Sequence, residues 1–228
     1  MSTLLVVGYG PGISRFVAER WAREGYSIAL VARSHERAAD AADKLRAAGV
    51  PAAAYEADAG DPTAIRAVVQ RVRADLGVIG AVLWTAFRGG GVRNLLATPP
   101  EDVGRAFDIG VVGLLACAQA VIDDLASSRG SLLVANGAMG EHSTAADRFA
   151  AQLDSDGVAL ENAAKSKLVG ILAARLRERG IYVGEVTIAG SVAGTETAEP
   201  SAIRPEDIAA QFWDLAQTRD SVRARMTP

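Results

Sequence analysis

LLVVGYGPGIS, residues 4–14, is an apolar run that breaks into glycines and leads into a helical segment at 15–21. The pattern predicts a buried strand, a tight turn and the start of a helix. A turn without side chains lets a ligand approach the backbone, and free N–H groups at a helix N-terminus attract an anion, usually a phosphate. The stretch therefore indicates a nucleotide pyrophosphate site, although a simple strand-to-helix corner shares the pattern.

The composition favours a soluble protein built around a single core. The chain has 228 residues, half of them hydrophobic, which predicts one domain over 1–228. A net charge of -3 provides no basic face for nucleic acid and no polybasic patch for a membrane. No basic leader precedes the first apolar run, and no later run approaches the ~20 residues of a membrane span. The sole cysteine, Cys117, lies in an apolar run and is interpreted as a core residue. We expect a cytoplasmic protein.

The rest of the chain alternates apolar runs of strand length with helical segments. Strands are predicted at 27–32, 52–56, 80–84, 131–135, 182–188 and 222–226, and helices at 35–48, from 61, and at 101–126, 158–179 and 204–217. Residues 137–157 form a long polar connection. Continuous apolar strands separated by helices indicate a parallel sheet that is buried on both faces. The predicted fold is a doubly wound α/β sheet, with its ligand crevice at the carboxyl ends of the strands.

With these elements, the whole chain resembles the short-chain dehydrogenase/reductase family of NAD(P)-dependent Rossmann enzymes. The family's glycine motif is Gly-x-x-x-Gly-x-Gly; Gly8 and Gly12 fall on its first two glycines and Ser14 on the third. The resemblance implies a pyrophosphate cradle made by Gly8, Tyr9, Gly10, Gly12 and Ile13.

The end of the second strand indicates which cofactor is used. An NAD enzyme places an acid there to hold the ribose hydroxyls, whereas this chain has Arg33 and Ser34. Arg33 can pair with a 2′-phosphate and Ser34 can donate to it, so NADP(H) is favoured; alternatively, Arg33 is simply solvated. Asp58 and Ala59 match the family's adenine contact, although Asp58 could instead cap the turn that follows.

Two further segments match cofactor contacts of the family. Ala86 falls on the alanine of its Asn-Ala-Gly element, whose two neighbours are replaced here. The segment after the sixth predicted strand resembles the family's Pro-Gly-x-x-x-Thr. The resemblance implies cofactor contacts from Gly190 and Val192, and a contact between Thr195 and the nicotinamide carboxamide.

The catalytic positions of the family are mostly replaced. Lys165 falls on the lysine, but Glu161 stands where the tyrosine belongs. Gly137 replaces the serine and Gly110 the asparagine. Glu161 starts with a pKa near 4.3, and a cation one turn away favours its ionised form, so it is a poor proton donor. Either it serves as an acid or base, or it pairs with Lys165 and fills the tyrosine site.

Other polar residues lie close to the expected substrate position. His142 can exchange protons near neutral pH without help, although an exposed loop histidine fits the sequence too. Arg88 and Arg93 could bind an acidic substrate or be solvated. No metal site is predicted.

Three functions remain open. The first is an NADP(H)-dependent oxidoreductase that acts on a small carbonyl or alcohol through a non-standard acid. The second is a catalytically silent NADP(H)-binding sensor or partner subunit, and the third is a non-redox isomerase or lyase with Glu161 as base. The family commonly pairs through two long helices, here 101–126 and 158–179, which implies a homo-oligomer, either a dimer or a tetramer.

Overall fold

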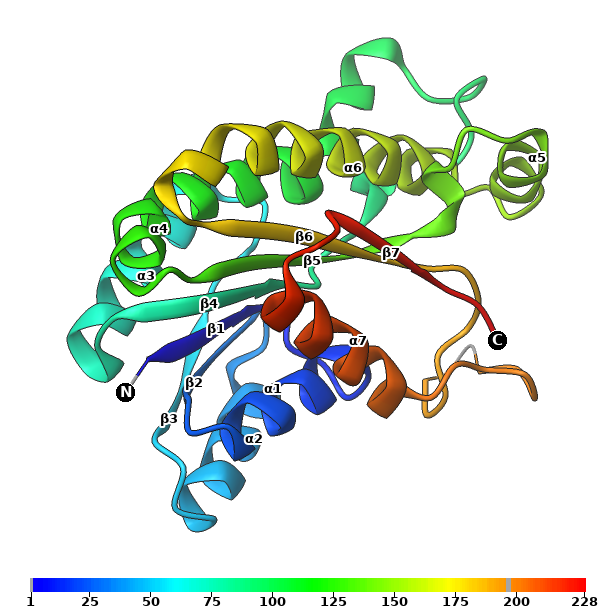
Figure 1. Cartoon of the computed structure of the whole chain (residues 1–228). Coiled ribbons are helices and arrows are strands. Elements are labelled where there is room, and N and C mark those ends of the chain that lie inside the picture. Colours follow the sequence, from blue (N-terminus) through cyan, green and yellow to red (C-terminus); the bar gives the residue numbers. More distant parts are fainter. Residues whose placement is uncertain (1, 196–197) are drawn as a thin grey trace.

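The strands of the computed structural model, which describes residues 2–195 and 198–228, form one seven-stranded sheet in the order β3-β2-β1-β4-β5-β6-β7 (Figure 1). All pairings are parallel. The strands are β1 (Thr3–Val7), β2 (Ser27–Ala32), β3 (Ala52–Glu56), β4 (Ile79–Trp84), β5 (Ser131–Gly137), β6 (Tyr182–Ile188) and β7 (Arg223–Met226). The chain builds outward from β1 through β2 and β3, then returns to the other side of β1 with β4. The predicted doubly wound sheet is confirmed, and the switch point between β1 and β4 is where such sheets bind ligands.

Helices cover both faces of the sheet (Figure 1). One layer holds α1 (Ile13–Arg23), α2 (His35–Ala47) and α7 (Pro205–Thr218), and the other holds α3 (Pro62–Leu76), α4 (Leu114–Ser128) and α6 (Asp156–Leu176). Each layer closes a core of its own against the sheet. Trp21, Leu30 and Phe212 are buried in the first core, and Val69 and Val121 in the second. Both faces of the strands are buried, as their continuous apolar runs predicted.

The helix predicted over 101–126 is not continuous. Pro100–Phe107 is a 3₁₀ segment and Asp108–Gly113 a π-helical turn, and only then does α4 begin. Gly113 approaches the carbonyl of Ala59 so closely that an added Cβ would lie 1.8 Å from its oxygen. This contact and the low helix propensity of glycine account for the irregular segment, which lies where π-turns are common, beside a candidate functional site.

The polar connection predicted over 137–157 contains two short elements. A 3₁₀ turn (Ala138–Gly140) is followed by α5 (Thr144–Gln152), which begins where the Ser143 hydroxyl accepts a hydrogen bond from the Ala146 N–H at 3.2 Å. Serine at the N-cap is a recognised helix start, and the composition of this segment concealed it.

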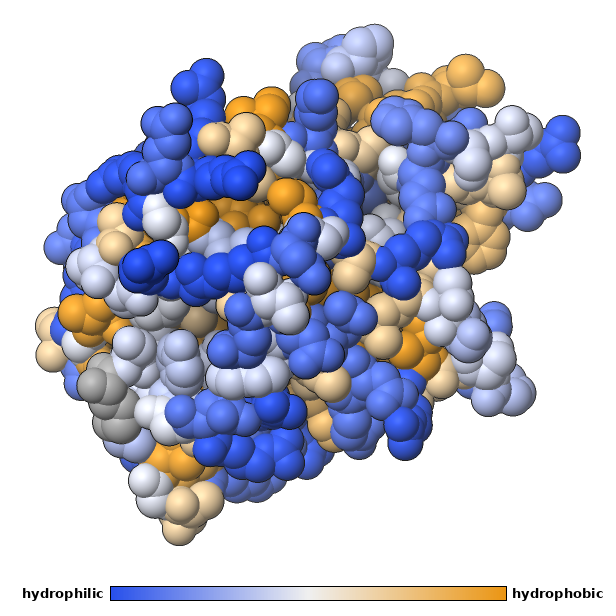
Figure 2. Space-filling model, in the orientation of Figure 1, coloured by the Kyte–Doolittle hydropathy of each residue, from blue (hydrophilic) through white to orange (hydrophobic). Residues whose placement is uncertain are grey.

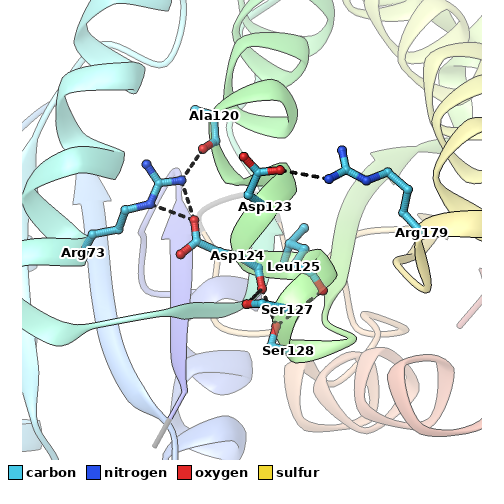
Figure 3. Close-up of polar contacts among 8 residues, drawn as sticks. All are labelled: Arg73, Ala120, Asp123, Asp124, Leu125, Ser127, Ser128 and Arg179. Carbon is cyan, nitrogen blue, oxygen red and sulfur yellow. Dashed lines mark hydrogen bonds and ion pairs between the residues drawn. The ribbon is translucent and has the colours of Figure 1, made fainter.

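Polar contacts hold α4 against its neighbours. Arg73 of α3 pairs with Asp124 and also donates to the carbonyl of Ala120, and Arg179 donates to Asp123 at 2.9 Å (Figure 3). By length and hydropathy, Pro100–Ser128 is the one stretch of the described chain that resembles a membrane span, although the sequence suggested none. Leu114 and Val121 are fully buried in the core, which accounts for the apolar character of α4 in a globular fold.

The surface drawn in Figure 2 is largely hydrophilic. Hydrophobic residues appear there in separate areas, one of them over the segment that follows β4. Leu96 in that segment is fully exposed, and Phe87 and Leu95 are also exposed.

Candidate cofactor and active site

The glycine turn lies at the switch point of the sheet. Gly8 ends β1 with a φ of 94°, which L side chains rarely adopt, and an added Cβ would lie 2.4 Å from the backbone nitrogen of Ala86. Thr85 donates its hydroxyl to the carbonyl of Gly8 at 2.9 Å. Only glycine fits at Gly8, because the ends of β1 and β4 are in direct contact there.

Ser14, at the third glycine position of the family motif, closes the turn on itself. Its hydroxyl accepts from the Gly10 N–H at 2.8 Å and donates to the Gly10 carbonyl at 3.0 Å. The Gly10 N–H, predicted to face the pyrophosphate, is therefore already bonded. In the described chain no hydrogen bond occupies the N–H groups of Gly12 and Ile13 at the start of α1, which has no side-chain cap. These groups fit a phosphate.

Tyr9 and the segment after β6 complete the walls of this turn. Tyr9 donates its backbone N–H to the carbonyl of Val31 at 2.9 Å and is half-buried against the α1 layer. An added Cβ on Gly12 would lie 3.3 Å from a methyl group of Thr195, so these two predicted cofactor residues are adjacent. Thr195 donates its hydroxyl to the carbonyl of Val192 at 2.7 Å. Gly190 is exposed and lies beside Pro228.

The residues predicted to bind the adenosine end of the cofactor lie close to one another. Arg33 and Ser34 are exposed where β2 ends, and Ser34 precedes the first residue of α2. The Gly60 N–H lowers the pKa of Asp58, and the charges of Arg88 and Arg33 act in the same direction. Arg88 binds both carboxylate oxygens of Asp58 at 3.1 Å, so this arginine is ion-paired where solvation was favoured.

Asp58 both bonds the Gly60 N–H at 2.9 Å and lines a cavity of about 210 Å³ together with Glu161. The turn-capping role that the sequence left open is therefore present. Ala59 is buried, with its carbonyl against Gly113 of the π-turn.

Glu161, in the tyrosine position, is fully buried on α6. Its Oε2 accepts the backbone N–H of Gly89 at 2.7 Å and that of Arg88 at 3.2 Å. Its Oε1 has no hydrogen-bond partner in the described chain and faces Gly110, where an added Cβ would lie 2.7 Å away. The carboxylate thus uses the space left by glycine at the family's asparagine position and holds the loop after β4.

Lys165, one turn further along α6, is 1% exposed. Burial lowers its pKa, against the opposing charges of Glu161 and Glu185. Among the described residues no hydrogen bond or ion pair reaches its ammonium group, so the direct ion pair with Glu161 that the sequence suggested is not formed. A buried ammonium group without a partner suits a ligand that brings hydroxyl oxygens.

Glu185, Asn136 and Asn162 complete this buried centre and were missed in the sequence. Glu185, 1% exposed on β6, accepts the Asn136 amide at 2.8 Å, and the same amide group donates to the Asn162 carbonyl at 2.9 Å. The second carboxylate oxygen of Glu185 lies 3.6 Å from Nε of Arg223 on β7. A lone acid within an apolar strand was the signal that could have identified Glu185.

Gly137, in the serine position, ends β5 beside the Asn162 side chain. An added Cβ on Gly137 would lie 2.6 Å from the Asn162 amide nitrogen, so that amide uses the space of the missing serine. His142 is exposed in the turn before α5, and its neighbour Glu141 pairs with Arg225 of β7. The structure therefore groups Glu161 and Lys165 with Glu185, and leaves His142 at the surface.

Comparisons with known proteins agree with this geometry. The family model for short chain dehydrogenases matches residues 2–147. A short chain dehydrogenase of Pseudocercospora fijiensis is 31% identical over 103 residues, 44% of this chain but only 32% of that protein. A short chain dehydrogenase from Burkholderia cenocepacia, solved in complex with NADP, has a TM-score of 0.84 at 22% identity, with 99% of this chain and 96% of that chain covered.

A 7α-hydroxysteroid dehydrogenase, solved with NADH and 7-oxo glycochenodeoxycholic acid, also has a TM-score of 0.84, at 21% identity and with 99% and 92% of the two chains covered. These structural likenesses show the fold. The family model includes the glycine turn and Asp58 and extends over more than half of the sequence. This chain belongs to the short chain dehydrogenase family.

Proposed function

We propose that the protein is an NADP(H)-dependent oxidoreductase of a small carbonyl or alcohol, with Lys165 as both cofactor-ribose ligand and proton donor. The observation that carries the proposal is that Lys165, on α6 at the position of the family's lysine, is only 1% exposed and makes no hydrogen bond or ion pair among the described residues. Burial lowers the pKa of Lys165, and the charges of Glu161 and Glu185 act against that effect without bonding the ammonium group. Its hydrogens remain available to a ligand.

The glycine turn supports a dinucleotide on the opposite side of the crevice. The free N–H groups of Gly12 and Ile13 lie at the start of α1, which has no side-chain cap, and Gly12 lies beside Thr195. Arg33 stands at the end of β2 with no acid beside it on that strand end, which supports a 2′-phosphate and hence NADP(H).

A nicotinamide bound in this crevice supplies or accepts hydride. The task of the chain is to deliver a proton to the substrate oxygen as the carbonyl is reduced, and to remove it in the reverse direction. A lysine whose pKa is lowered by burial is a better proton donor near neutral pH than one at its ordinary value. Loss of the proton leaves a neutral amine, which the buried site tolerates.

The other predicted acids fit this task less well. The Glu161 carboxylate accepts two backbone N–H groups, which fixes its Oε2 on the loop after β4. This bonding also weighs against Glu161 as the base of an isomerase or lyase. His142 lies on the exposed turn before α5.

A second candidate is a catalytically silent NADP(H)-binding protein. The bonds of Glu161 to the loop and the Asn162 amide beside Gly137 favour it, because both use space where the family has reacting groups. The two candidates share cofactor binding and differ in turnover.

Cofactor binding is tested by calorimetric titration with NADPH and NADH. Wild-type protein is expected to bind NADPH more tightly, and Arg33→Ala to lose about tenfold in NADPH affinity alone. Arg37→Ala, an exposed arginine on α2, is the matched control. Equal affinity of Arg33→Ala and wild type for NADPH would contradict the assignment.

Turnover is tested by NADPH oxidation with a panel of small aldehydes and ketones. Lys165→Met is expected to abolish oxidation, whereas Lys167→Met, an exposed lysine on the same helix, keeps it. NADPH binding without oxidation of any member of the panel would favour the silent protein. Oxidation that persists in Lys165→Met and is lost in Glu161→Gln would assign the proton transfer to Glu161.

A further inference from the structure

A second cavity lies at the opposite edge of the sheet from the glycine turn. Its volume is about 390 Å³, larger than the cavity beside Glu161. The amino ends of β1, β4 and β5 border it together with α1 and the C-terminal ends of α4 and α7. No residue of the cofactor crevice lines it, so the functions proposed above leave it unexplained.

Ser131 gives this cavity a buried hydrogen-bonding group. It is the first residue of β5 and only 4% exposed, and no hydrogen bond reaches its hydroxyl in the part of the chain that the structure describes. Side chains alternate along a strand, and Leu133 belongs to the core beneath α1 and α7. Ser131 therefore points to the same side, where the cavity lies.

Two arginines at helix ends line the cavity. Arg129 follows α4 and Arg219 follows α7, both in the left-handed conformation, with φ of 50° and 54°. Glycine is the usual residue at such positions, so arginine adopts this backbone only with strain. Arg219 donates to the carbonyls of Ala216 and Arg129, which fixes the two helix ends together. Within the described chain no acid pairs with the guanidinium of Arg129.

The remaining lining adds neutral donors and no acid. Tyr26 is half-buried, and its hydroxyl has no hydrogen bond among the described residues. Burial raises its pKa, with the Arg219 charge acting against that effect, so the hydroxyl keeps its proton at neutral pH. Ser128 also lines the cavity, but its hydroxyl donates back to the Asp124 carbonyl (Figure 3). No aspartate or glutamate lines the cavity, which disfavours a cation.

We propose that this cavity is a binding site for a small hydroxylated anion, with its phosphate or carboxylate group on Arg129 and Arg219 and its hydroxyls on Ser131 and Tyr26. Guanidinium groups recognise both oxyanions through N–H donors, and Arg219 keeps Nη1 for this, because its Nε and Nη2 donate to backbone carbonyls. The volume lies within the range of small-ligand sites. The site is separate from the cofactor crevice, so the proposal of anion binding does not depend on hydride transfer by the protein.

Glycerol 3-phosphate and glycerate, which differ in the oxyanion and share hydroxyl groups, serve as the two probes, titrated calorimetrically into the full chain at matched ionic strength. Arg129→Gly is the decisive variant, because glycine suits the left-handed backbone and the fold is expected to be at least as stable. We expect it to weaken binding of the preferred anion about tenfold, the effect of one lost charge-assisted contact. Ser131→Ala is expected to weaken binding less. Whichever probe binds more tightly identifies the oxyanion.

Arg148→Ala, which removes an exposed arginine from α5, is the charge-matched control and is expected to leave binding unchanged. Glycerol 3-phosphate bound at the glycine turn would survive Arg129→Gly, so binding that is equal in this variant and in wild type overturns the proposal. Failure of both anions to bind wild-type protein overturns it as well. Thermal unfolding of each variant shows that the comparison is between folded proteins.

Discussion

Glu161 Oε2 lies 2.7 Å from the backbone nitrogen of Gly89, which joins the middle of the sixth helix to the loop that follows the fourth strand. In the family the residue at this position moves the substrate proton. Here the side chain is a structural acceptor for two N–H groups of the loop, and Lys165 one turn away has no partner among the described residues. Glu161 therefore holds the backbone of the loop, and the Lys165 ammonium group is left for a ligand.

Glu161→Ala is expected to lower the free energy of unfolding by about 2–4 kcal/mol, because it leaves the buried Gly89 N–H and the partly buried Arg88 N–H without an acceptor and opens a cavity. Glu161→Gln keeps an acceptor oxygen and is expected to cost about 1 kcal/mol. Urea denaturation monitored by fluorescence measures both. Equal losses in the two variants would show that the carboxylate does not act through these hydrogen bonds.

Gly110→Ala tests the contact on the other side of the same carboxylate. Its Cβ would lie 2.6 Å from Glu161 Cγ, so we expect a loss of about 1–3 kcal/mol from overpacking. In a Glu161→Ala background the same change is expected to be nearly neutral, since the opposing side chain is gone. A double-mutant cycle measures this coupling; additive losses would mean that the helix backbone, not Glu161, requires glycine.

The sequence predicted the sheet well, because the sheet follows from local patterns, and the cofactor residues were inferred from local patterns too. Continuous apolar strands, the glycine turn and Arg33 after β2 need no knowledge of distant contacts. The structure places Gly8 against Ala86 and Gly12 against Thr195, as a single cradle requires.

The buried candidate site was harder to predict because its contacts join residues far apart in sequence. One of the two roles that the sequence left open for Glu161 was a pair with Lys165, its neighbour on the helix, yet its partners are the N–H groups of Arg88 and Gly89. Glu185 lies in the strand at 182–188, which was predicted from its apolar residues alone. Likewise, the break before α4 depends on Gly113 meeting the Ala59 carbonyl, a contact that helical periodicity does not report.

The lowered pKa of Lys165 predicts a pH dependence of stability. Above its folded-state pKa the native protein has lost this proton, while the unfolded chain keeps it up to about pH 10.5, so the unfolded state binds more protons. The contribution of Lys165 to the free energy of unfolding therefore rises with pH across that window. The free energy of unfolding of wild type minus that of Lys165→Met, from urea denaturation between about pH 7 and 10, is expected to increase with pH. A flat or falling difference would contradict a buried, destabilised ammonium group.

Ser14 and Ser34 are expected to respond in opposite ways when each is replaced by alanine. The Ser14 hydroxyl, buried in the glycine turn, makes two hydrogen bonds to Gly10, so Ser14→Ala should cost about 1–2 kcal/mol of stability. It leaves the free N–H groups of Gly12 and Ile13 untouched, and NADPH affinity should change less than about threefold. The exposed Ser34 makes no capping bond, so Ser34→Ala should leave stability within about 0.5 kcal/mol and weaken NADPH binding. Urea denaturation and NADPH titration of both variants test the pair, and a loss of NADPH affinity in Ser14→Ala without a loss of stability would place its hydroxyl on the cofactor instead.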